Sequence, residues 1–413
     1  MSTNHENCNS DELEAPQWLD VQFFTKILNS YLKKPELKVL DLKLSPASAK
    51  GDHYASIMFR AEIVYTTQTT EKSTVNLIIK TIPEEQGHKK DLLDNSHVFP
   101  TEIAMYTEIL PKFEKILRDA GDKTTLYAPC VYHSLEPRQV IVFEDLVAKG
   151  YAVVRNRPAT IEELKYALEK LGKWHAVSHK IIKDQPELFE KLQYDVTTLP
   201  NILKEDFMTS ALSVFINMLE NVQSLRPYKK YFELMEGKLV NRWVDVIREY
   251  RENRQENGYY VLCHGDFHLR NMMFKGPDCM LLDFQMSYVG SMANDIIYAI
   301  YMLFGTDKLG NQCNELIYHY FKTFVDTLKI IAFKGKLPSL IEFRQQIFDK
   351  RYNDFLLMTT LMPTVMFMRK GEDAAVLLEG EDQRSKLLYQ KDFQAELEYL
   401  LPRMLHLGYF DQL

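Results

Sequence analysis

The sequence predicts an α+β protein with two lobes, a small lobe built on an antiparallel sheet and a large lobe that is mostly helical. Two patterns lead to this prediction. Three strand-like runs follow one another between residues 37 and 82 and are separated by short polar segments, which is typical of an antiparallel meander. From residue 160 onward, apolar residues recur at helical spacing for roughly a hundred residues. We expect a flexible acidic tail at 1–15, the small lobe at 16–146 and the large lobe at 147–413, with a cleft between the lobes.

The small lobe should begin with a helix, because apolar residues recur every three or four positions after Pro16, and Pro35 should end it. Strands are then expected at 37–44, 55–65 and 73–82, with a polar turn at 66–72 between the last two. One face of the second strand carries Ile57, Phe59, Ala61 and Ile63.

The small lobe should continue with a helix at 99–110, which has Pro100 in its first turn and Pro111 as its stop. Two further strands are expected at 128–134 and 139–146. In the large lobe, Thr160 should cap a helix at 161–179, because Glu163 follows three residues later as in a capping box.

The rest of the large lobe should contain two short buried strands, at 259–264 and 280–284. Residues 291–413 should be mostly helical, with breaks near Gly305, Gly335, Pro338, Pro363 and Gly371.

The composition excludes several classes of protein. Lys and Arg number 50 and Asp and Glu number 57, so the net charge is −7 and a general nucleic-acid binder is not expected. The five cysteines are scattered without a CxxC pair, which disfavours a disulfide framework and a zinc site. The first residues lack the apolar segment of a signal peptide, and the longest charge-free runs are too short to span a membrane. We therefore expect a soluble, cytoplasmic monomer.

The segment 261–284 carries the strongest chemical signal. It holds His264, Asp266, Asn271 and Asp283 in the pattern H-x-D-x-x-x-x-N followed by an apolar pair and D-F, between two apolar runs. This is the spacing of a kinase catalytic loop and its metal-binding segment. Asp266 is the expected catalytic base, since a hydroxyl nucleophile needs an acceptor for its proton. Asn271 and Asp283 offer the hard oxygen ligands that Mg²⁺ prefers, and His264 is expected to support the loop from beneath.

A lysine and a glutamate further upstream form the second signal. Lys80 ends the apolar run 77–79 in the third strand, as the lysine that contacts ATP phosphates does in kinases. Such a lysine is held by a helical glutamate, and Glu102 in the following helix is the expected partner. Glu108 is the competing acid, although it lies nearer the end of that helix.

Two other segments are candidates for contacts with ATP. The loop 45–56 joins the first two strands, where Ser48, Gly51 and Ser56 could meet phosphate oxygens, although it has only one glycine and a plain hairpin loop is the alternative. The connector 142–146 could offer backbone groups of Glu144 and Leu146 to adenine.

The helices after the catalytic segment provide the remaining candidates. Asp295 should brace the catalytic loop from the start of a helix. An acceptor pocket could be lined by apolar and aromatic residues of these helices, and an ordinary core is the alternative reading of the same residues. They are Tyr298, Tyr301, Met302, Phe304, Phe355, Met358, Met362 and Met366.

Together these segments resemble the insect ecdysteroid kinase-like family, also described as CHK kinase-like proteins, which is similar to choline kinases and aminoglycoside phosphotransferases. The resemblance covers nearly everything after the tail. It rests on APQWL, AKGDHYASIMFR, LIIKTIP, TEIAMYTEILP, VFEDL, LGKWHAVSH, LCHGDFHLRNMMF and LLDFQMSYVGSMANDIIY.

The resemblance implies a bilobal protein-kinase-like fold, MgATP as donor, and a small-molecule alcohol such as a steroid or xenobiotic as acceptor. It implies Asp266 as base, Asn271 and Asp283 as metal ligands, and Lys80 on the ATP phosphates with Glu102 holding it. The chain departs from the family in the stretch 267–270, where many members carry a tryptophan, so the acceptor need not be an ecdysteroid.

Three alternatives remain open at this point. One is a choline-, ethanolamine- or aminoglycoside-type kinase, and another is a pseudokinase that binds a steroid or nucleotide without turnover. A protein kinase is disfavoured, because the chain has neither a G-x-G-x-x-G loop nor an A-P-E segment.

Overall fold

The computed structural model describes residues 13–47, 56–68, 70–85, 90, 93, 96–155, 157–192, 194–252, 258–305, 312–370 and 380–413. The chain divides into two units. The first comprises Met1–Pro111 and Tyr127–Ala152, and the second comprises Lys112–Leu126 and Val153–Leu413. The predicted boundary at residue 146 lies six residues before the end of the first unit, and residues 112–126 belong to the second unit. Most of the predicted tail lies outside the described residues.

The first unit is built on a five-stranded antiparallel sheet with the strand order β1-β2-β3-β5-β4. The strands are β1 (Lys38–Pro46), β2 (Ile57–Thr67), β3 (Thr70–Thr81), β4 (Cys130–Ser134) and β5 (Val140–Glu144). Ile79 at the centre of the sheet pairs with Phe59 on one side and Val142 on the other. This sheet confirms the predicted antiparallel part of the α+β plan.

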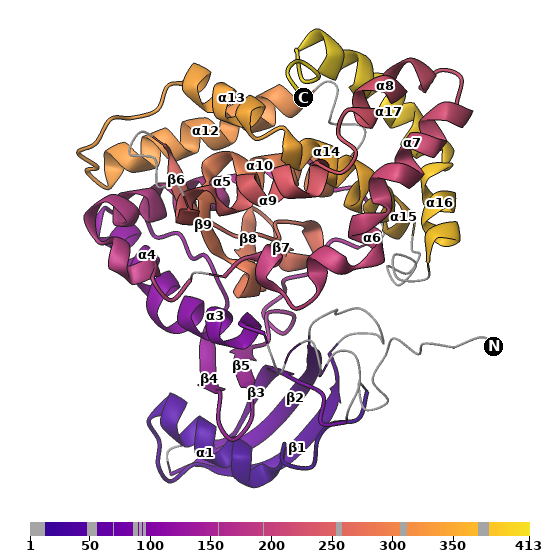
Figure 1. The fold of residues 1–413 in the computed structure, drawn as a ribbon. Helices are drawn as coiled ribbons and strands as arrows, with labels where there is room; N and C mark the ends of the chain where they lie inside the picture. The colour runs from indigo at the N-terminus through magenta and orange to yellow at the C-terminus, as the bar shows by residue number, and fades with distance from the viewer. Residues whose placement is uncertain are drawn as a thin grey trace, which may run out of the picture. The chain divides into compact units, whose positions relative to one another are not determined.

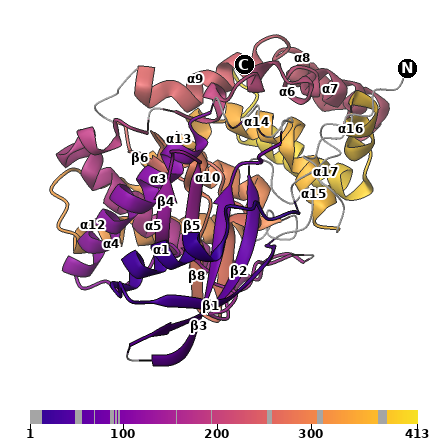
Figure 2. The same cartoon turned by 90° about the horizontal axis from the view of Figure 1, so that it is seen from below.

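Helix α1 (Val21–Leu32) covers the sheet of the first unit (Figures 1 and 2). Its Phe24, Ile27 and Leu28 join one hydrophobic core with the predicted face of β2, in which all four side chains are buried. The helix begins later than the apolar spacing after Pro16 predicts, because Asp20 caps it by accepting a hydrogen bond from Phe23 N at 2.7 Å.

The prediction that Pro111 ends a helix is wrong. Helix α3 (Val98–Ala104) is followed by a π-helical turn, η1 (Met105–Ile109), and then by α4 (Leu110–Asp119), so the helical path continues through Pro111. Proline lacks an amide hydrogen and its ring crowds the carbonyl group of the preceding turn. The wider π turn, in which Leu110 N donates to Met105 O, relieves that crowding.

The second unit is centred on the long helix α5 (Ile161–Asp184), against which α12 (Cys313–Ile330) packs. The predicted capping box is confirmed, since Glu163 N donates to Thr160 Oγ1 at 3.2 Å and Thr160 N donates to Glu163 Oε2 at 2.8 Å. Most of α4 also belongs to this unit, and its other described helices of eight or more residues are α7 (Ala211–Asn221), α9 (Leu239–Glu252), α10 (Met292–Ala299), α13 (Leu340–Asp349), α14 (Tyr352–Thr359), α15 (Leu361–Met368), α16 (Glu381–Leu388) and α17 (Lys391–His406).

Short helical elements complete the second unit. They are η2 (Pro186–Phe189), η3 (Val196–Thr198), η4 (Ile202–Lys204), α6 (Asp206–Thr209), η5 (Arg226–Tyr228), α8 (Lys229–Glu233), η6 (Leu269–Asn271), η7 (Phe284–Met286) and η8 (Ile300–Phe304). No helix of the described segments is long and apolar enough to cross a membrane.

Two small antiparallel pairs of strands lie within this helical unit. Strand β6 (Tyr260–Cys263) pairs with β9 (Tyr288–Ser291), and β7 (Met272–Lys275) pairs with β8 (Asp278–Leu281). The sequence predicts β6 and β8, while β7 and β9 were not predicted. Every strand here has four residues, so the pairs serve chiefly to hold the loops that connect them.

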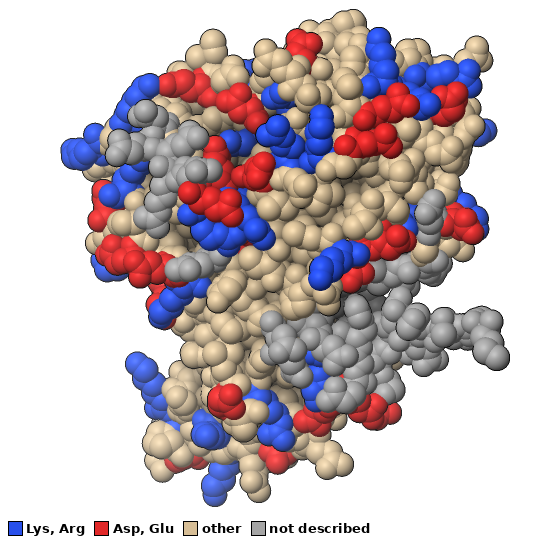
Figure 3. All heavy atoms as spheres, viewed as in Figure 1, with Lys and Arg blue, Asp and Glu red and all other residues tan. Residues whose placement is uncertain are grey.

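The viewed surface of the second unit mixes charges of both signs (Figure 3). Lys229 contacts both Glu220 and Glu233, and Lys350 lies 2.6 Å from Glu249. The four cysteines among the described residues are free thiols, of which Cys263 and Cys279 are fully buried.

Candidate active site

The loop after β6 carries the predicted catalytic residues of the second unit. It runs from His264 through η6 into β7, and Leu282 N donates to Asn271 O at 2.9 Å. This hydrogen bond ties the chain just before Asp283 to the end of the loop. The two strand pairs therefore bring the halves of segment 261–284 together, as its apolar runs predict.

The carboxylate of Asp266 is held by three side chains. Tyr298 donates its hydroxyl to Oδ1 at 2.6 Å, Asn271 Nδ2 donates to Oδ2 at 2.9 Å, and His268 Nε2 lies 3.3 Å from Oδ1. Burial opposes ionisation, but His268, Tyr298 and His264 hold the pKa of Asp266 well below its ordinary value. About a quarter of the side chain, 27%, remains exposed, so a ligand can reach it.

His268 and Tyr298 are site residues whose contacts the sequence reasoning missed. Burial lowers the pKa of His268, but the charge of Asp266 and its hydrogen bond raise it above the ordinary value, so the two form an ion pair. Burial and the nearby Asp266 raise the pKa of Tyr298, which stays a neutral donor. One signal was available, because Tyr298 lies one turn after Asp295 and so shares its face of α10.

Gly265 is the residue on which the shape of this loop depends. Its φ is +81°, and a Cβ built there would lie 2.1 Å from the carbonyl oxygen of Met286. A side chain would therefore meet both backbone strain and a steric clash. Only glycine fits between β6 and the turn η7.

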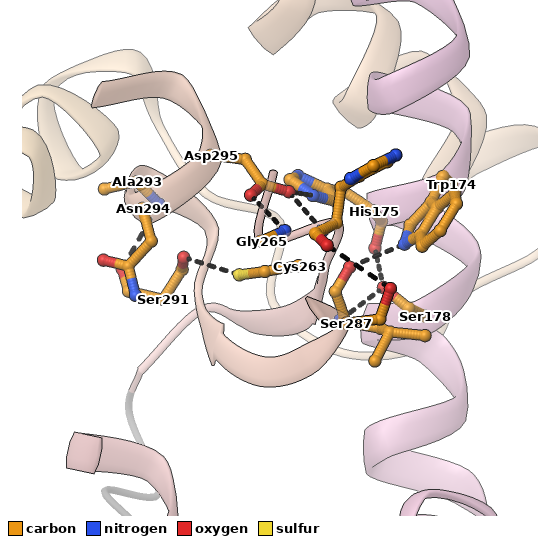
Figure 4. A network of polar contacts seen from close by, with 12 residues as sticks. Trp174, His175, Ser178, Cys263, Gly265, Ser287, Ser291, Ala293, Asn294 and Asp295 are labelled. Atoms are coloured by element: carbon orange, nitrogen blue, oxygen red, sulfur yellow. Dashed lines mark hydrogen bonds and ion pairs between the residues drawn. The ribbon is translucent and has the colours of Figure 1, made fainter. Parts of the chain in front are cut away.

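Asp295 braces the catalytic loop from the first turn of α10, which confirms the prediction for it (Figure 4). Oδ2 accepts hydrogen bonds from His264 N at 2.6 Å and from His175 Nε2 at 3.1 Å, and Oδ1 accepts one from Gly265 N at 3.0 Å. His175 is itself held by the hydroxyl of Tyr320, 2.6 Å from its Nδ1. Burial works against the charge of Asp295, but His175 and the loop amides lower its pKa.

Further hydrogen bonds tie β6 to helix α5 beside this carboxylate (Figure 4). Trp174 Nε1 donates to Leu262 O at 2.6 Å, and Leu262 N donates to Ser178 Oγ at 2.9 Å. The strand that leads into the catalytic loop is thus fixed on both sides, by α5 and by α10.

His264 lies beneath the loop, where it was expected, and is fully buried. Its Nε2 lies 3.0 Å from Leu282 O and its Nδ1 lies 3.4 Å from Asp266 N. Burial lowers the pKa of His264, so the ring is neutral, donates from Nε2 and accepts at Nδ1. This geometry supports positioning of the loop and offers no route to a substrate.

The two predicted metal ligands present oxygen atoms suited to Mg²⁺. Asn271 uses Nδ2 for Asp266 O and Oδ2, which leaves its carbonyl oxygen as the group that can face a cation. Asp283 has a left-handed backbone, with φ of 60°, and its negative charge acts on both His264 and His268. One amide oxygen and one carboxylate fit the few protein ligands of a magnesium ion that also binds phosphates.

In the first unit, the predicted pair of Lys80 and Glu102 is formed. Lys80 Nζ lies 2.6 Å from Glu102 Oε2, and the two side chains are only 4% and 1% exposed. Glu108, the competing acid, is exposed on η1. Because burial is nearly complete, each charge depends on the other.

The other predicted ATP contacts are less well defined. Ser48 and Gly51 lie outside the described residues, and Ser56 is buried. Glu144 N donates to Pro129 O, and Leu146 O accepts from two amides of the following turn. Contacts of Glu144 and Leu146 with adenine therefore stay a prediction.

A cavity of about 220 Å³ lies beside Asp266 in the second unit. His268 and Tyr298, which both contact Asp266, belong to its wall, and so does Met302. Four other predicted pocket residues are core instead, as the alternative reading had it, since they are at most 1% exposed. They are Phe304, Phe355, Met358 and Met362.

The model of the ecdysteroid kinase-like family matches residues 50–333, which include Lys80, Glu102 and the segment from His264 to Tyr298 but neither Ser48 nor the cavity residues from 361 to 369. The chain belongs to the ecdysteroid kinase-like family. This membership confirms the resemblance predicted from the motifs and the predicted class of enzyme, a kinase that acts on small molecules. Among curated proteins, none matches this member of the family.

Solved structures that match this chain include two kinases. A choline kinase from Cryptosporidium parvum Iowa II has 10% identity and a TM-score of 0.41, covering 95% of this chain and 100% of that one. A Plasmodium vivax ethanolamine kinase has 12% identity and a TM-score of 0.41, covering 91% and 89%.

Proposed function

We propose that this member of the ecdysteroid kinase-like family transfers the γ-phosphate of ATP to a hydroxyl group of a small hydrophobic molecule, an ecdysteroid-like steroid or a xenobiotic. One observation carries the proposal. The carboxylate of Asp266 contacts His268, Tyr298 and Asn271, remains partly exposed, and adjoins a cavity that two of these side chains line, and His268 and Tyr298 lower its pKa. An ionised carboxylate in that place can accept a hydrogen bond from a hydroxyl nucleophile and orient it.

Each of the other site residues has a proposed role of its own. Lys80, held by Glu102, binds phosphate oxygens of ATP from the first unit. Asn271 and Asp283 hold Mg²⁺, which neutralises charge on the phosphates when it is bound. His264 and Asp295 keep the loop in place.

The two units would then act as an ATP-binding lobe and a catalytic lobe of one enzyme, because a single phosphoryl transfer needs both Lys80 and Asp266. The scattered free thiols favour a reducing compartment such as the cytoplasm. We propose a monomer there, since the roles above need only one copy of the chain.

Phosphoryl transfer from labelled ATP to a panel of ecdysteroids, other sterols, phenols, glycosides and choline tests the proposal. The wild-type chain should label at least one neutral or acidic alcohol, and Asp266→Asn should reduce that rate by about 10²–10⁴-fold, which is the usual contribution of a positioned base. Asp266→Asn should keep a shift of melting temperature with MgATP, because mass action stabilises any chain that still binds the nucleotide. Retained turnover in this variant would refute the role of Asp266. A wild-type chain that binds MgATP and labels nothing would instead be a pseudokinase.

A further inference from the structure

The cavity beside Asp266 is lined by two chemically different groups of residues. The apolar group consists mainly of Met302, Leu269 of η6 and residues of α15. Those of α15 are Leu361, Val365 and Met368. The cationic group consists of Arg155, Arg157, Arg270 and Arg369 together with His268. Among the described residues that line this cavity, none is an aspartate or a glutamate.

Two of these cations are balanced by acids next to them. Arg157 forms two hydrogen bonds with the carboxylate of Glu163, at 2.8 and 2.6 Å. His268 is paired with Asp266. These two groups therefore add little net charge to the cavity.

Arg369 is also partly balanced. Its Nη2 donates to Met302 O at 3.1 Å, and the charge of Glu396 acts on it. Burial lowers the pKa of Arg369. Arg270 belongs to η6 of the catalytic loop, where its charge acts on His268, and Arg155 is a further arginine of the cavity lining.

An arginine that already has a partner can still bind an anion. The guanidinium group has five N–H donors in a planar fork, which matches a carboxylate, sulfate or phosphate. Several such groups around one cavity give charge-assisted hydrogen bonds that an uncharged ligand cannot form.

We propose that the acceptor is a hydroxylated organic anion, with an apolar body against α15, an acidic group on the arginines that line the cavity, and its hydroxyl at Asp266. This inference rests on the proposed kinase function and names the class of its acceptor. The volume of about 220 Å³ lies below the ~300–1,000 Å³ typical of pockets for drug-sized ligands, so the cavity encloses a compact acid or one end of a larger one. Choline-like cations are disfavoured, because their recognition uses aromatic rings and acids, whereas arginines stand here.

Matched acceptors that differ only in charge test the proposal. A hydroxylated steroid acid and a hydroxyphenyl acid are compared with their methyl esters, using wild-type protein, MgATP and phosphoryl transfer to each compound. The acids should be preferred by at least about tenfold in kcat/KM, which corresponds to one charge-assisted contact. Arg270→Gln and Arg155→Gln should reduce that preference mainly through KM, and Arg226→Gln, on the surface beside Glu220, should leave it unchanged.

The other outcomes are also decisive. Equal or better use of the esters would overturn the proposal. A loss of turnover that is the same for acid and ester in Arg270→Gln would overturn it as well, because the arginine would then serve the transferred phosphate.

A binding measurement tests this inference independently of the proposed kinase function. If no compound is phosphorylated, calorimetry can still measure how tightly the acid and its ester bind to the wild type and to Arg270→Gln. Tighter binding of the acid that is lost in the variant supports the anion site, and equal binding refutes it. If neutral sterols are phosphorylated and acids are not preferred, the proposed kinase function holds and the anion site is refuted.

Discussion

Replacing Asp295 by asparagine tests whether the catalytic loop is held by one buried carboxylate. Three N–H groups converge on it, from His264, Gly265 and the ring of His175. Asparagine has nearly the same shape but only one acceptor oxygen, and its amide group would face a donor. The substitution therefore changes the hydrogen bonding of the site and hardly its packing.

The expected loss follows from these three contacts. If the amide oxygen takes the place of Oδ2, it keeps His264 N and His175, each weakened by about 1 kcal/mol because the acceptor is no longer charged. Gly265 N loses its acceptor, which costs about 1–3 kcal/mol for a buried donor. The sum is about 3–5 kcal/mol, a large part of the roughly 5–15 kcal/mol that stabilises a typical domain.

Guanidinium unfolding followed by tryptophan fluorescence measures this loss, because Trp174 lies in the same core. Hydrogen exchange gives a local readout, and the amides of His264 and Gly265 should exchange faster in Asp295→Asn. The control is Asp326→Asn, an exposed carboxylate that contacts Lys322 and Lys329 and should unfold at the wild-type denaturant concentration. A loss below about 1 kcal/mol in Asp295→Asn, with unchanged amide exchange, would refute the bracing role.

Three other substitutions follow from the structure. Gly265→Ala should prevent folding of the catalytic loop and abolish activity. Its control is Gly237→Ala, where φ is +68° and no atom lies within 4 Å of the added carbon. Thermal melting of this control should show a loss of only about 1–2 kcal/mol in the free energy of unfolding. Lys80→Met should destabilise the chain by about 3–5 kcal/mol, since it removes the cation that lies 2.6 Å from the buried carboxylate of Glu102, and the double variant with Glu102→Gln should recover part of that loss in denaturant titrations. Burial raises the pKa of Asp354 to about 7, so the folded chain holds a proton that the unfolded chain releases between about pH 4 and 7. Stability should therefore fall as pH rises through this window and level off above it, and unfolding midpoints of Asp354→Asn at pH 5 and 8 should show a smaller difference than those of the wild type.

Patterns local in the sequence predicted much of the fold. The alternation in β2 placed Ile57, Phe59, Ala61 and Ile63 on one buried face, and Thr160 with Glu163 marked the start of α5. The prediction that the helix ends at Pro111 was wrong because the preceding turn is a π turn, which lets the helix continue. No pattern in the sequence indicated this wider turn.

The sequence predicted the part of the site that depends only on the spacing of residues along the chain. The segment 261–284 needs only two short strand pairs to bring its polar residues together, so Asp266 and Asn271 could be placed from their positions. The contact of Tyr298 with Asp266 depends on how α10 packs beside the loop, and the cavity gathers arginines from separate segments. Such contacts arise from tertiary packing. Helical spacing places Tyr298 on the same face of α10 as Asp295, but it does not place its hydroxyl against Asp266.

The contacts of Asp266 also bear on where the proton of the acceptor hydroxyl can go. A carboxylate that is paired with His268 and accepts a hydrogen bond from Tyr298 can orient a hydroxyl but is a weak base, since these contacts lower its pKa. In the proposed reaction the hydroxyl must become acidic first, as its oxygen bonds to phosphorus, and only then release the proton through Asp266 to solvent. The carboxylate would take up the proton only transiently and pass it to solvent, so that Asp266 would be ionised again before the next acceptor binds.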